Sequence, residues 1–160
     1  MKPKGERPME FRTFTPQERR PELIDQLTQV WAASVRATHD FLSPEDFEAI
    51  AAQVPQALRE VPSLTVAWDD GAGPVGFLGV AGHTLEMFFL APEQIGTGLA
   101  DRLFRHAMAQ HYIAQITVNE QNLRALNFYL RRSYRVHHRT ATDGMGLPYP
   151  ILTLTLSCYG

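Results

Sequence analysis

The sequence predicts one α/β domain built on a single mixed β-sheet (α+β in its arrangement), with about seven strands and four helices. Three observations support this prediction. With 160 residues the chain can bury a sizeable core. Residues 64–90 contain three β-rich runs joined by short glycine-containing turns, which is typical of consecutive antiparallel strands. An amphipathic helix then leads to another β-rich run at 113–118, and a helical crossover joins strands that are parallel.

The N-terminal part is expected to contain a short strand followed by a helix. Residues 1–8 (MKPKGERP) are predicted to be disordered or tag-like, and residues 9–160 to form the single domain. The strand covers 9–14. Thr15 and Pro16 then begin the helix, because Thr can cap a helix and Pro is tolerated in its first turn. The apolar face of this helix follows from the helical spacing of Leu23, Leu27, Val30, Trp31, Ser34 and Val35.

A second helix is predicted to start at Ser43 and Pro44, and Pro55 should kink or split it. His39 lies between the two helices. Two interpretations of His39 stay open: a loop histidine whose ring is satisfied by a backbone carbonyl, and a catalytic residue.

The centre of the domain is predicted to be the stretch 85–107. Its first part, 85–90, is a nearly continuous apolar run typical of an internal strand, and Pro92 ends that strand. Gly96 and Gly98 then open a helix whose unpaired backbone N–H groups and dipole could bind an anion, most often phosphate. A simple helix start without a ligand explains the same glycines about as well.

Two nucleotide-binding motifs fit this glycine turn poorly. A P-loop is excluded because no Gly-Lys-Ser/Thr follows the glycines. A dinucleotide fingerprint requires a third glycine where Ala100 stands, although Glu120 could imitate its acidic residue. The consecutive antiparallel strands also argue against the repeated parallel units of a dinucleotide fold.

Strict alternation along the central strand assigns its side chains to two faces of the sheet. One face would carry Thr84, Glu86, Phe88 and Leu90, and the other Leu85, Met87 and Phe89. Glu86 is then an acid in an otherwise apolar strand, which costs free energy unless the carboxylate is solvated or used. Both interpretations of Glu86 stay open.

A helix predicted at 123–132 should present two different sides. Its apolar side would consist of Leu123, Leu126 and Leu130. Another side carries an amide, a small residue and a phenol at helical spacing, and these are Asn122, Ala125 and Tyr129. Such a set leaves a groove with a polar group at each end. Alternatively, the amide is only an N-cap and the phenol only an interfacial aromatic.

Two further strands are expected to end the domain, at 134–140 and 151–157, with a turn at 142–146. Leu and Thr alternate in the last strand, as in a half-buried strand. Pro148, Tyr149 and Pro150 should form an extended lead-in, because each proline lacks a ladder donor.

Composition narrows the function classes. Fifteen Lys and Arg against 17 Asp and Glu give a formal charge of -2, which offers no electrostatic case for nucleic acid or an anionic membrane. No segment has the apolar length of a membrane span or of a signal peptide. The single cysteine, Cys158, excludes an intrachain disulfide and a cysteine metal cluster, and is expected to be a strand-end residue. We therefore expect a cytoplasmic protein that binds neither a metal, nucleic acid nor a membrane.

The order strand, Pro, Gly-x-Gly-x-Ala, helix, strand, Asn-x-x-Ala-x-x-Phe-Tyr resembles the GNAT superfamily of CoA-dependent N-acetyltransferases. The matching residues are Pro92, Gly96, Gly98, Ala100, Asn122, Ala125, Phe128 and Tyr129. The match covers 11–156, and the segments 37–42 (ATHDFL) and 146–150 (GLPYP) look like a small bacterial stand-alone subgroup. Two positions depart from the family pattern: Ile95 replaces the usual Arg or Gln of the pyrophosphate loop, and Ser133 replaces a usual Gly.

The resemblance implies acetyl-CoA as co-substrate, with its pantetheine arm between the central strand and 113–118. The diphosphate would lie on the backbone N–H groups of 95–100. Asn122 would hydrogen-bond the pantetheine, and Tyr129 would protonate the departing thiolate. The cofactor-binding residues implied are Phe89, Leu90, Ile95, Gly96, Thr97, Gly98, Leu99, Ala100, Asn122, Ala125 and Phe128.

The same resemblance implies acetyl transfer to a primary amine by direct attack on the thioester in a ternary complex. A lysine-like amine with a pKa of ~10.4 is neutral in only about 1 in 10³ molecules at pH 7, a penalty of roughly 4–5 kcal/mol. A base is therefore needed, and Glu86 and His39 are rival candidates. A backbone N–H near Phe88 or Phe89 would stabilise the developing oxyanion.

The acceptor pocket is expected to be lined by Trp31, His39, Phe41, Glu86 and Tyr149. A lysine side chain, a protein N-terminus, a polyamine and an antibiotic amine all fit it, and the enzyme could be a monomer or a homodimer. An alternative from another class is a non-catalytic acyl-CoA-binding sensor or partner-binding module, which Ile95 supports. Tyr129→Phe separates the two, because an enzyme would lose turnover and a sensor would be indifferent. A nucleotide-binding domain, the third reading, would let ATP or NAD compete with CoA.

Overall fold

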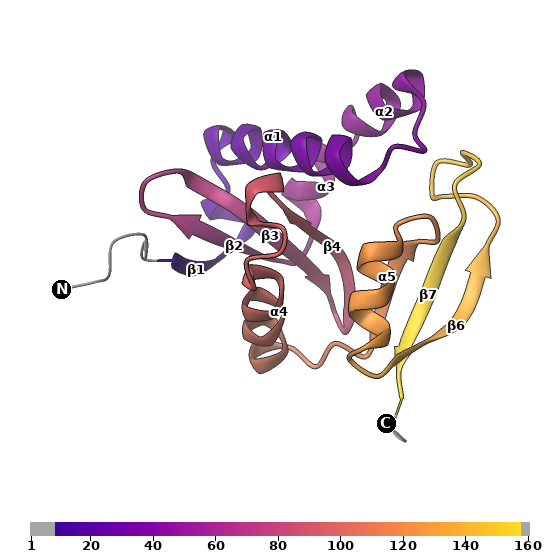
Figure 1. The fold of residues 1–160 in the computed structure, drawn as a ribbon. Helices are drawn as coiled ribbons and strands as arrows, with labels where there is room; N and C mark the ends of the chain where they lie inside the picture. Colours follow the sequence, from indigo (N-terminus) through magenta and orange to yellow (C-terminus); the bar gives the residue numbers. More distant parts are fainter. Residues whose placement is uncertain (1–8, 158–160) are drawn as a thin grey trace.

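Seven strands form one mixed sheet in the order β1-β2-β3-β4-β5-β7-β6 within residues 9–157, the part that the computed structural model describes (Figure 1). Neighbouring strands are antiparallel except β4 and β5, which are parallel. The strands are β1 (Met9–Phe14), β2 (Ser63–Asp69), β3 (Gly73–Ala81), β4 (Thr84–Leu90), β5 (Gln115–Asn119), β6 (Tyr134–Thr140) and β7 (Ile151–Leu156). The mixed sheet and its helical crossover are confirmed.

Helices cover both faces of the sheet and create two apolar cores. The helices are α1 (Pro21–Thr38), α2 (Pro44–Ala51), α3 (Val54–Glu60), α4 (Leu99–Gln110) and α5 (Leu123–Leu130). Residues of α1 and α3 pack against β2 and β3 around Leu64 and Phe77, whereas α4 and α5 pack on the other face around Leu78 and Ile116. No helix within residues 9–157 combines the length and the apolar character that crossing a membrane requires. The predictions for residues 1–8 and for Cys158 concern positions outside the described residues.

The first helix begins later than predicted. Thr15 caps a short 3-10 turn, Pro16–Glu18, and its backbone N–H donates to the Glu18 carboxylate over 2.8 Å. Arg20 is extended, with φ -67° and ψ 156°, because the residue before a proline avoids the helical region. The α-helix therefore starts at Pro21.

The predicted split of the second helix is observed. The helix that starts after Ser43 ends at Ala51, and α3 restarts with Val54 and Pro55 in its first turn. Proline lacks the N–H that an uninterrupted helix would need, so the break falls just before it. This break accounts for five α-helices in the described residues where about four were expected.

The apolar side predicted for α5 is wrong at its first member. Leu123 is 63% exposed, whereas Tyr129 is 5% exposed and belongs to the core between α4 and the sheet. Leu123 directly follows the N-cap Asn122 and is the first residue of the helix, where its side chain stays exposed.

A β-bulge overturns the alternation predicted for β4. Val80 of β3 pairs with Leu85, and the next residue, Gly79, pairs with Met87, so Glu86 has no partner in the ladder. The extra residue shifts the side-chain phase. Leu85 consequently lies in the same core as Phe88, while Glu86 lines a cavity together with Met87.

The parallel strands β4 and β5 separate soon after they meet. They pair only through Thr84 with Gln115 and Leu85 with Ile116. Beyond the bulge the strands diverge, while β5 stays paired with β7 over its whole length. The sheet therefore contains a gap at its centre, as the resemblance to the acetyltransferases implied.

Candidate active site

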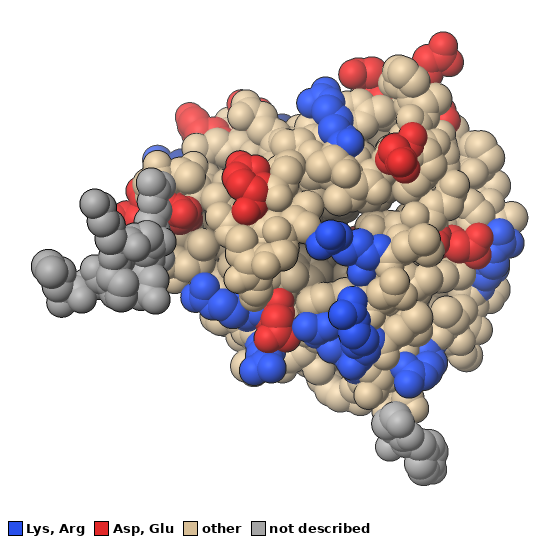
Figure 2. Space-filling model, in the orientation of Figure 1, with Lys and Arg blue, Asp and Glu red and all other residues tan. Residues whose placement is uncertain are grey.

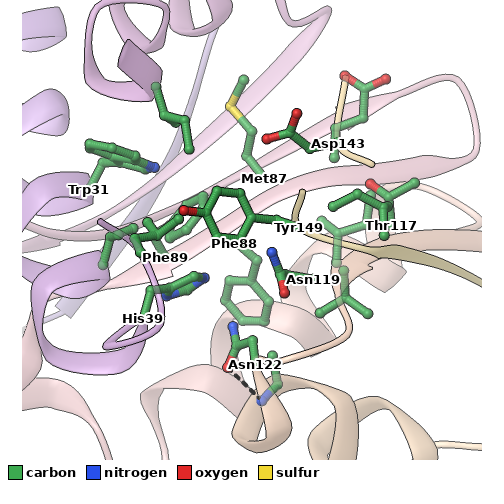
Figure 3. Close-up of a pocket in the computed structure, with 18 of the residues that line it drawn as sticks. Trp31, His39, Met87, Phe88, Phe89, Thr117, Asn119, Asn122, Asp143 and Tyr149 are labelled. Carbon is green, nitrogen blue, oxygen red and sulfur yellow. Dashed lines mark hydrogen bonds between the residues drawn. The ribbon is translucent and has the colours of Figure 1, made fainter. Parts of the chain in front are cut away.

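Two adjoining hollows fill the gap between β4 and β5. The first, here called the inner pocket, has a volume of about 250 Å³ and lies between α1, β4, β5, α5 and the loop before β7 (Figure 3). The second, the outer groove, has a volume of about 110 Å³ and leads from the inner pocket towards the glycine turn before α4. The two share His39, Phe88, Phe89, Asn122, Ala125 and Tyr129.

Tyr129 lies at the junction of the two hollows. Its ring packs against Phe104, Phe128 and Tyr134, with centroid distances of 6.3, 5.6 and 6.5 Å. Within residues 9–157 its phenol makes no hydrogen bond, although the side chain is buried. Burial raises the pKa of Tyr129 well above its ordinary value, so the phenol keeps its proton at neutral pH.

Asn122 is both a helix cap and a lining residue. Its Oδ1 accepts a hydrogen bond of 3.3 Å from the backbone N–H of Ala125, drawn as a dashed line in Figure 3. The Nδ2 group has no partner in the described part of the chain. The two interpretations of Asn122 are thus compatible, because capping with the oxygen leaves the two amide donors available to a ligand.

The glycine turn presents free backbone donors. Gly96 and Gly98 have φ values of 83° and 88°, a left-handed conformation that glycine adopts without strain. The N–H groups of Gly96, Gly98 and Ala100 have no hydrogen-bond partner among residues 9–157. They precede or belong to the first turn of a 12-residue helix, α4, whose dipole also favours an anion.

The residues predicted around this turn contribute in different ways. Phe89, Leu90, Ile95, Ala100, Ala125 and Phe128 all line the outer groove. Thr97 is exposed and donates its hydroxyl to the Gln94 carbonyl over 2.7 Å. The side chain of Leu99 is only 2% exposed and belongs to the core, so Leu99 can reach a ligand only through its backbone.

Arg124 lines the outer groove and was missed from the sequence. It is exposed, and within the described residues it has no ion pair. Ile95 lines the same groove, so Arg124 brings a cation to the groove in which the resemblance implies that a polar contact is missing. Figure 2 shows Lys and Arg side chains gathered around the hollow over α4 and α5.

Four of the five predicted acceptor residues line the inner pocket: Trp31, His39, Glu86 and Tyr149. Phe41 instead packs behind the lining, with centroid distances of 5.1 Å to the His39 ring and 6.0 Å to the Tyr149 ring. The sequence predicted that Phe41 lines the pocket, but the loop between α1 and α2 places its ring next to the rings of His39 and Tyr149. Glu86 is exposed at the bulge.

Tyr149 contributes its ring to the pocket and its hydroxyl to the fold. The phenol donates to the Asp46 carboxylate and accepts a hydrogen bond of 3.4 Å from the Ser43 backbone N–H. Both partners lie at the start of α2. The loop before β7 is therefore tied to the N-terminus of α2 across the mouth of the inner pocket.

His39 lines the inner pocket and the outer groove. Its Nδ1 lies 2.7 Å from the Thr38 hydroxyl and not against a backbone carbonyl, so the predicted loop-histidine interpretation had the wrong partner. Burial lowers the pKa of His39 to about 4, with nearby Asp40 opposing the shift. The ring is therefore neutral at physiological pH.

Further lining residues carried no usable signal in the sequence. Thr117 and Asn119 come from the far end of β5, and Asp143 comes from the loop between β6 and β7. Asp143 Oδ1 accepts two hydrogen bonds of 2.9 Å from the backbone of Met145 and Leu147, so this carboxylate also shapes its own loop. The sequence shows that these three side chains are polar, but it does not show that they meet in one pocket, because that depends on how the strands pair across the sheet.

Comparison with known proteins places this geometry in a family. The acetyltransferase (GNAT) domain family matches residues 17–149. A relative from Escherichia coli K12, the peptidyl-lysine N-acetyltransferase YjaB, is 37% identical over 135 residues, which cover 84% of this chain and 91% of that protein. The YjaB protein of Salmonella typhimurium LT2 is also 37% identical, over 84% of this chain and 92% of its own length.

Solved structures agree on the fold. The solution structure of the apo form of YjaB from Escherichia coli superposes with a TM-score of 0.79 at 34% identity, covering 92% of this chain and 96% of that chain. The PaiA N-acetyltransferase of Thermoplasma acidophilum, solved with coenzyme A, has a TM-score of 0.66 at 19% identity, covering 92% and 99% of the two chains.

Proposed function

The chain belongs to the GNAT acetyltransferase family and is an acetyl-CoA-dependent N-acetyltransferase, and on that premise we propose that it acetylates lysine side chains of proteins. The lysine acceptor is supported by the 37% identical relative, which is named a peptidyl-lysine N-acetyltransferase. Residues 9–160 act as one catalytic domain in this proposal.

The residues around the gap fit acetyl-CoA. The separated strands leave room for the pantetheine arm, and the Asn122 amide and the free N–H groups before α4 supply donors for its amide and phosphate oxygens. Acetyl-CoA, when bound, supplies an acetyl group that is activated as a thioester. Phe89, Leu90, Ala125 and Phe128 would hold the apolar part of the arm, and Arg124 would face the phosphates.

Ile95 is compatible with this arrangement. The turn offers backbone donors that need no side chain at position 95, and Arg124 brings a cation from α5 to the same groove. The phosphate contact missing at Ile95 would thus come from another helix.

The open edge of β4 provides a donor for the thioester oxygen. Ala91 donates its N–H to the Val75 carbonyl over 2.8 Å, towards β3. Backbone N–H groups alternate between the two edges of a strand, so the N–H groups of Phe88 and Leu90 face the gap. We expect the Phe88 N–H to stabilise the negative charge that develops on the thioester oxygen.

Tyr129 would act as the general acid. Its phenol is protonated, unpartnered within the described residues and placed at the junction of the inner pocket and the outer groove. That position lets it give a proton to the departing sulfur as the amine attacks from the inner pocket. This unpartnered phenol is the observation that carries the proposed direct-attack mechanism.

The lysine acceptor can be tested with blocked peptides. A peptide with an acetylated N-terminus and one lysine offers only an ε-amine, and a lysine-free peptide with a free N-terminus offers only an α-amine. We expect thiol release and an acetyl mass increase with the first peptide and neither with the second. Transfer to the second peptide alone, or to a polyamine alone, would show that the acceptor is not peptidyl lysine.

A further inference from the structure

We propose that Thr38 holds His39 in the Nδ1-protonated tautomer, which leaves Nε2 as the atom that receives the proton of the attacking amine. This proposal rests on the proposed function. It assigns the base that Glu86 and His39 compete for, and it gives Thr38 a positioning role.

The tautomer follows from a count of hydrogens. The Thr38 hydroxyl donates to the Ser34 carbonyl over 2.7 Å, one turn back along α1. The same oxygen lies 2.7 Å from His39 Nδ1. A hydroxyl has one hydrogen, and Ser34 already receives it, so Nδ1 must be the donor in the second contact. A neutral imidazole with its hydrogen on Nδ1 carries its lone pair on Nε2.

The surroundings keep the ring in this position. His39 forms the C-cap of α1, and its backbone N–H donates to the Val35 carbonyl over 2.7 Å. The ring lies 5.1 Å from the Phe41 ring, measured between centroids. The backbone hydrogen bond fixes the position of the residue, and the Phe41 ring and the Thr38 oxygen both contact the imidazole.

Nε2 is available to a substrate. It has no hydrogen-bond partner among residues 9–157. Figure 3 shows the His39 ring edge directed into the pocket, on the side of Asn119 and Asn122. His39 also lines both hollows, as Tyr129 does, so the proposed base and the proposed acid meet at the same junction.

Acetyl transfer moves one proton from the amine to His39 and one from Tyr129 to the sulfur. The ammonium first loses one proton to solvent, and the neutral amine donates an N–H hydrogen bond to Nε2, which directs its lone pair at the thioester carbon. The nitrogen–carbon bond forms, the carbon–sulfur bond breaks with its electron pair on sulfur, Nε2 takes the remaining excess proton from nitrogen, and Tyr129 protonates sulfur. The proton on His39 then passes to solvent and Tyr129 regains one, leaving amide and thiol.

Glu86 is the weaker candidate on the same grounds. Its carboxylate is exposed at the bulge and has no hydrogen bond within the described residues that would fix its direction. It lines the inner pocket and a neighbouring cavity but not the outer groove, where the thioester arm would lie.

Nitrogen-15 NMR of the ligand-free protein tests the tautomer without any substrate. We expect His39 to show a protonated Nδ1 and an unprotonated Nε2 near pH 7. Thr38→Val removes the hydroxyl and should abolish this signature, whereas Thr38→Ser should restore it. An Nε2-protonated ring in the unaltered protein would overturn the proposal.

Kinetics with the lysine peptide test the catalytic part. We expect His39→Gln to lower kcat about 100-fold and Thr38→Val about 10-fold, with Thr38→Ser close to the unaltered enzyme and the Kd of acetyl-CoA unchanged in all three. Thr28→Val is the matched control, because Thr28 makes the same 2.7 Å hydrogen bond to Ile24 one turn back in α1, away from the site. It should leave kcat unchanged.

The peptide assay and the variants of His39 and Thr38 can fail independently, so the acceptor, the base and the positioning role are tested separately. If no peptide lysine is acetylated but another amine is, the same variants are measured with that amine, and only the acceptor assignment fails. If transfer occurs and His39→Gln keeps its full kcat, the base assignment is wrong while the enzyme stands. If Thr38→Val loses kcat and Thr38→Ser does not recover it, the hydroxyl is not the cause and the positioning role is wrong.

Discussion

The two edges of β4 behave in opposite ways. Towards β3 the strand pairs at six positions from Thr84 to Leu90, interrupted only by the bulge at Glu86. Towards β5 it pairs at two, Thr84 and Leu85. One edge of β4 is thus hydrogen-bonded along nearly its whole length, whereas the other edge is unpaired beyond Leu85 and borders the gap. These edges are here called the closed side and the open side.

The residues proposed to act in catalysis lie at the open edge of β4. Every residue that both hollows share lies on the open side or faces it from α1 or α5. Polar groups without partners also gather there: the Tyr129 phenol, the Asn122 amide and the N–H groups before α4. On the closed side the polar groups are satisfied by the ladder, so changes there should alter stability and changes at the gap should alter chemistry.

The largest expected effect is at Tyr129. Tyr129→Phe removes a hydroxyl that makes no hydrogen bond within residues 9–157, so the free energy of unfolding should stay nearly constant. We expect kcat to fall about 100-fold or more, with the Kd of acetyl-CoA within about twofold, because the acid is lost and the packing is kept. Steady-state kinetics and titration calorimetry check both quantities.

Tyr134→Phe is the matched control, because the Tyr134 ring packs against the Tyr129 ring but its hydroxyl is already hydrogen-bonded within the fold. The Tyr134 hydroxyl is buried and donates to the Ile113 carbonyl over 2.7 Å. Its loss should lower the free energy of unfolding by about 1–2 kcal/mol and leave kcat nearly unchanged. If Tyr129→Phe lost stability and Tyr134→Phe lost turnover, the distinction between an unpartnered phenol that acts in catalysis and a hydrogen-bonded phenol that stabilises the fold would be wrong.

The next effect concerns pH and His39. Burial lowers the pKa of His39 from 6.5 to about 4, so between these values the unfolded chain binds a proton that the folded chain does not. The contribution of His39 to stability is complete above pH 6.5 and is lost as the pH falls through about 4, a difference of roughly 3 kcal/mol at most. Urea unfolding across pH 4–7 should show this slope.

His39→Gln should flatten the slope, because glutamine does not titrate. An identical pH dependence in this variant would mean that other groups cause it. The measurement reports folding, so it is independent of the role that His39 has in catalysis.

The central strand, the glycine turn and the polar side of α5 could be predicted because the sequence patterns that specify them span only a few residues. The apolar run of β4, Pro92, the two glycines and the start of α4 follow one another within a few residues, and so do Asn122, Ala125 and Tyr129. Turn chemistry and helical spacing act over such distances, and the antiparallel run of β2, β3 and β4 and the parallel crossover to β5 then followed from the connections.

The residues that were missed or misplaced depend on long-range register. The bulge at Glu86 exists only in the pairing with β3, and Asp143 reaches the pocket only because β7 lies beside β5. Thr38 and Thr28 occupy the same helix and make the same backbone contact, and in the sequence Thr38 differs by standing directly before His39. The sequence shows that adjacency, but it does not show that the His39 ring lies in a cavity with Nδ1 against the Thr38 hydroxyl.

A smaller effect is expected at the outer end of the gap. Arg124→Ala should raise the Kd of acetyl-CoA about 5- to 10-fold and weaken its dependence on salt, because one exposed cation is removed from the phosphate site. Titration with dephospho-CoA separates the 3′-phosphate from the diphosphate as the contact. Arg59→Ala, which removes an exposed cation from α3, serves as the control, and an equal loss in both variants would contradict a role specific to Arg124.

The smallest effect concerns Ser133, which lies in the turn between α5 and β6 and lines neither the inner pocket nor the outer groove. Its φ is 70°, the only positive value of a residue other than glycine among residues 9–157, and it stands where the family usually has glycine. Its N–H donates to the Leu130 carbonyl over 3.3 Å and its carbonyl accepts from Ser157 over 2.8 Å, so the backbone holds the strained conformation. Ser133→Gly should relieve that strain and raise the free energy of unfolding by about 0.5–1 kcal/mol after the entropic cost of glycine, with kcat unchanged. Ser133→Ala keeps the Cβ and should give no gain, so an equal increase in both variants would show that the hydroxyl, and not the backbone, sets the stability of this turn.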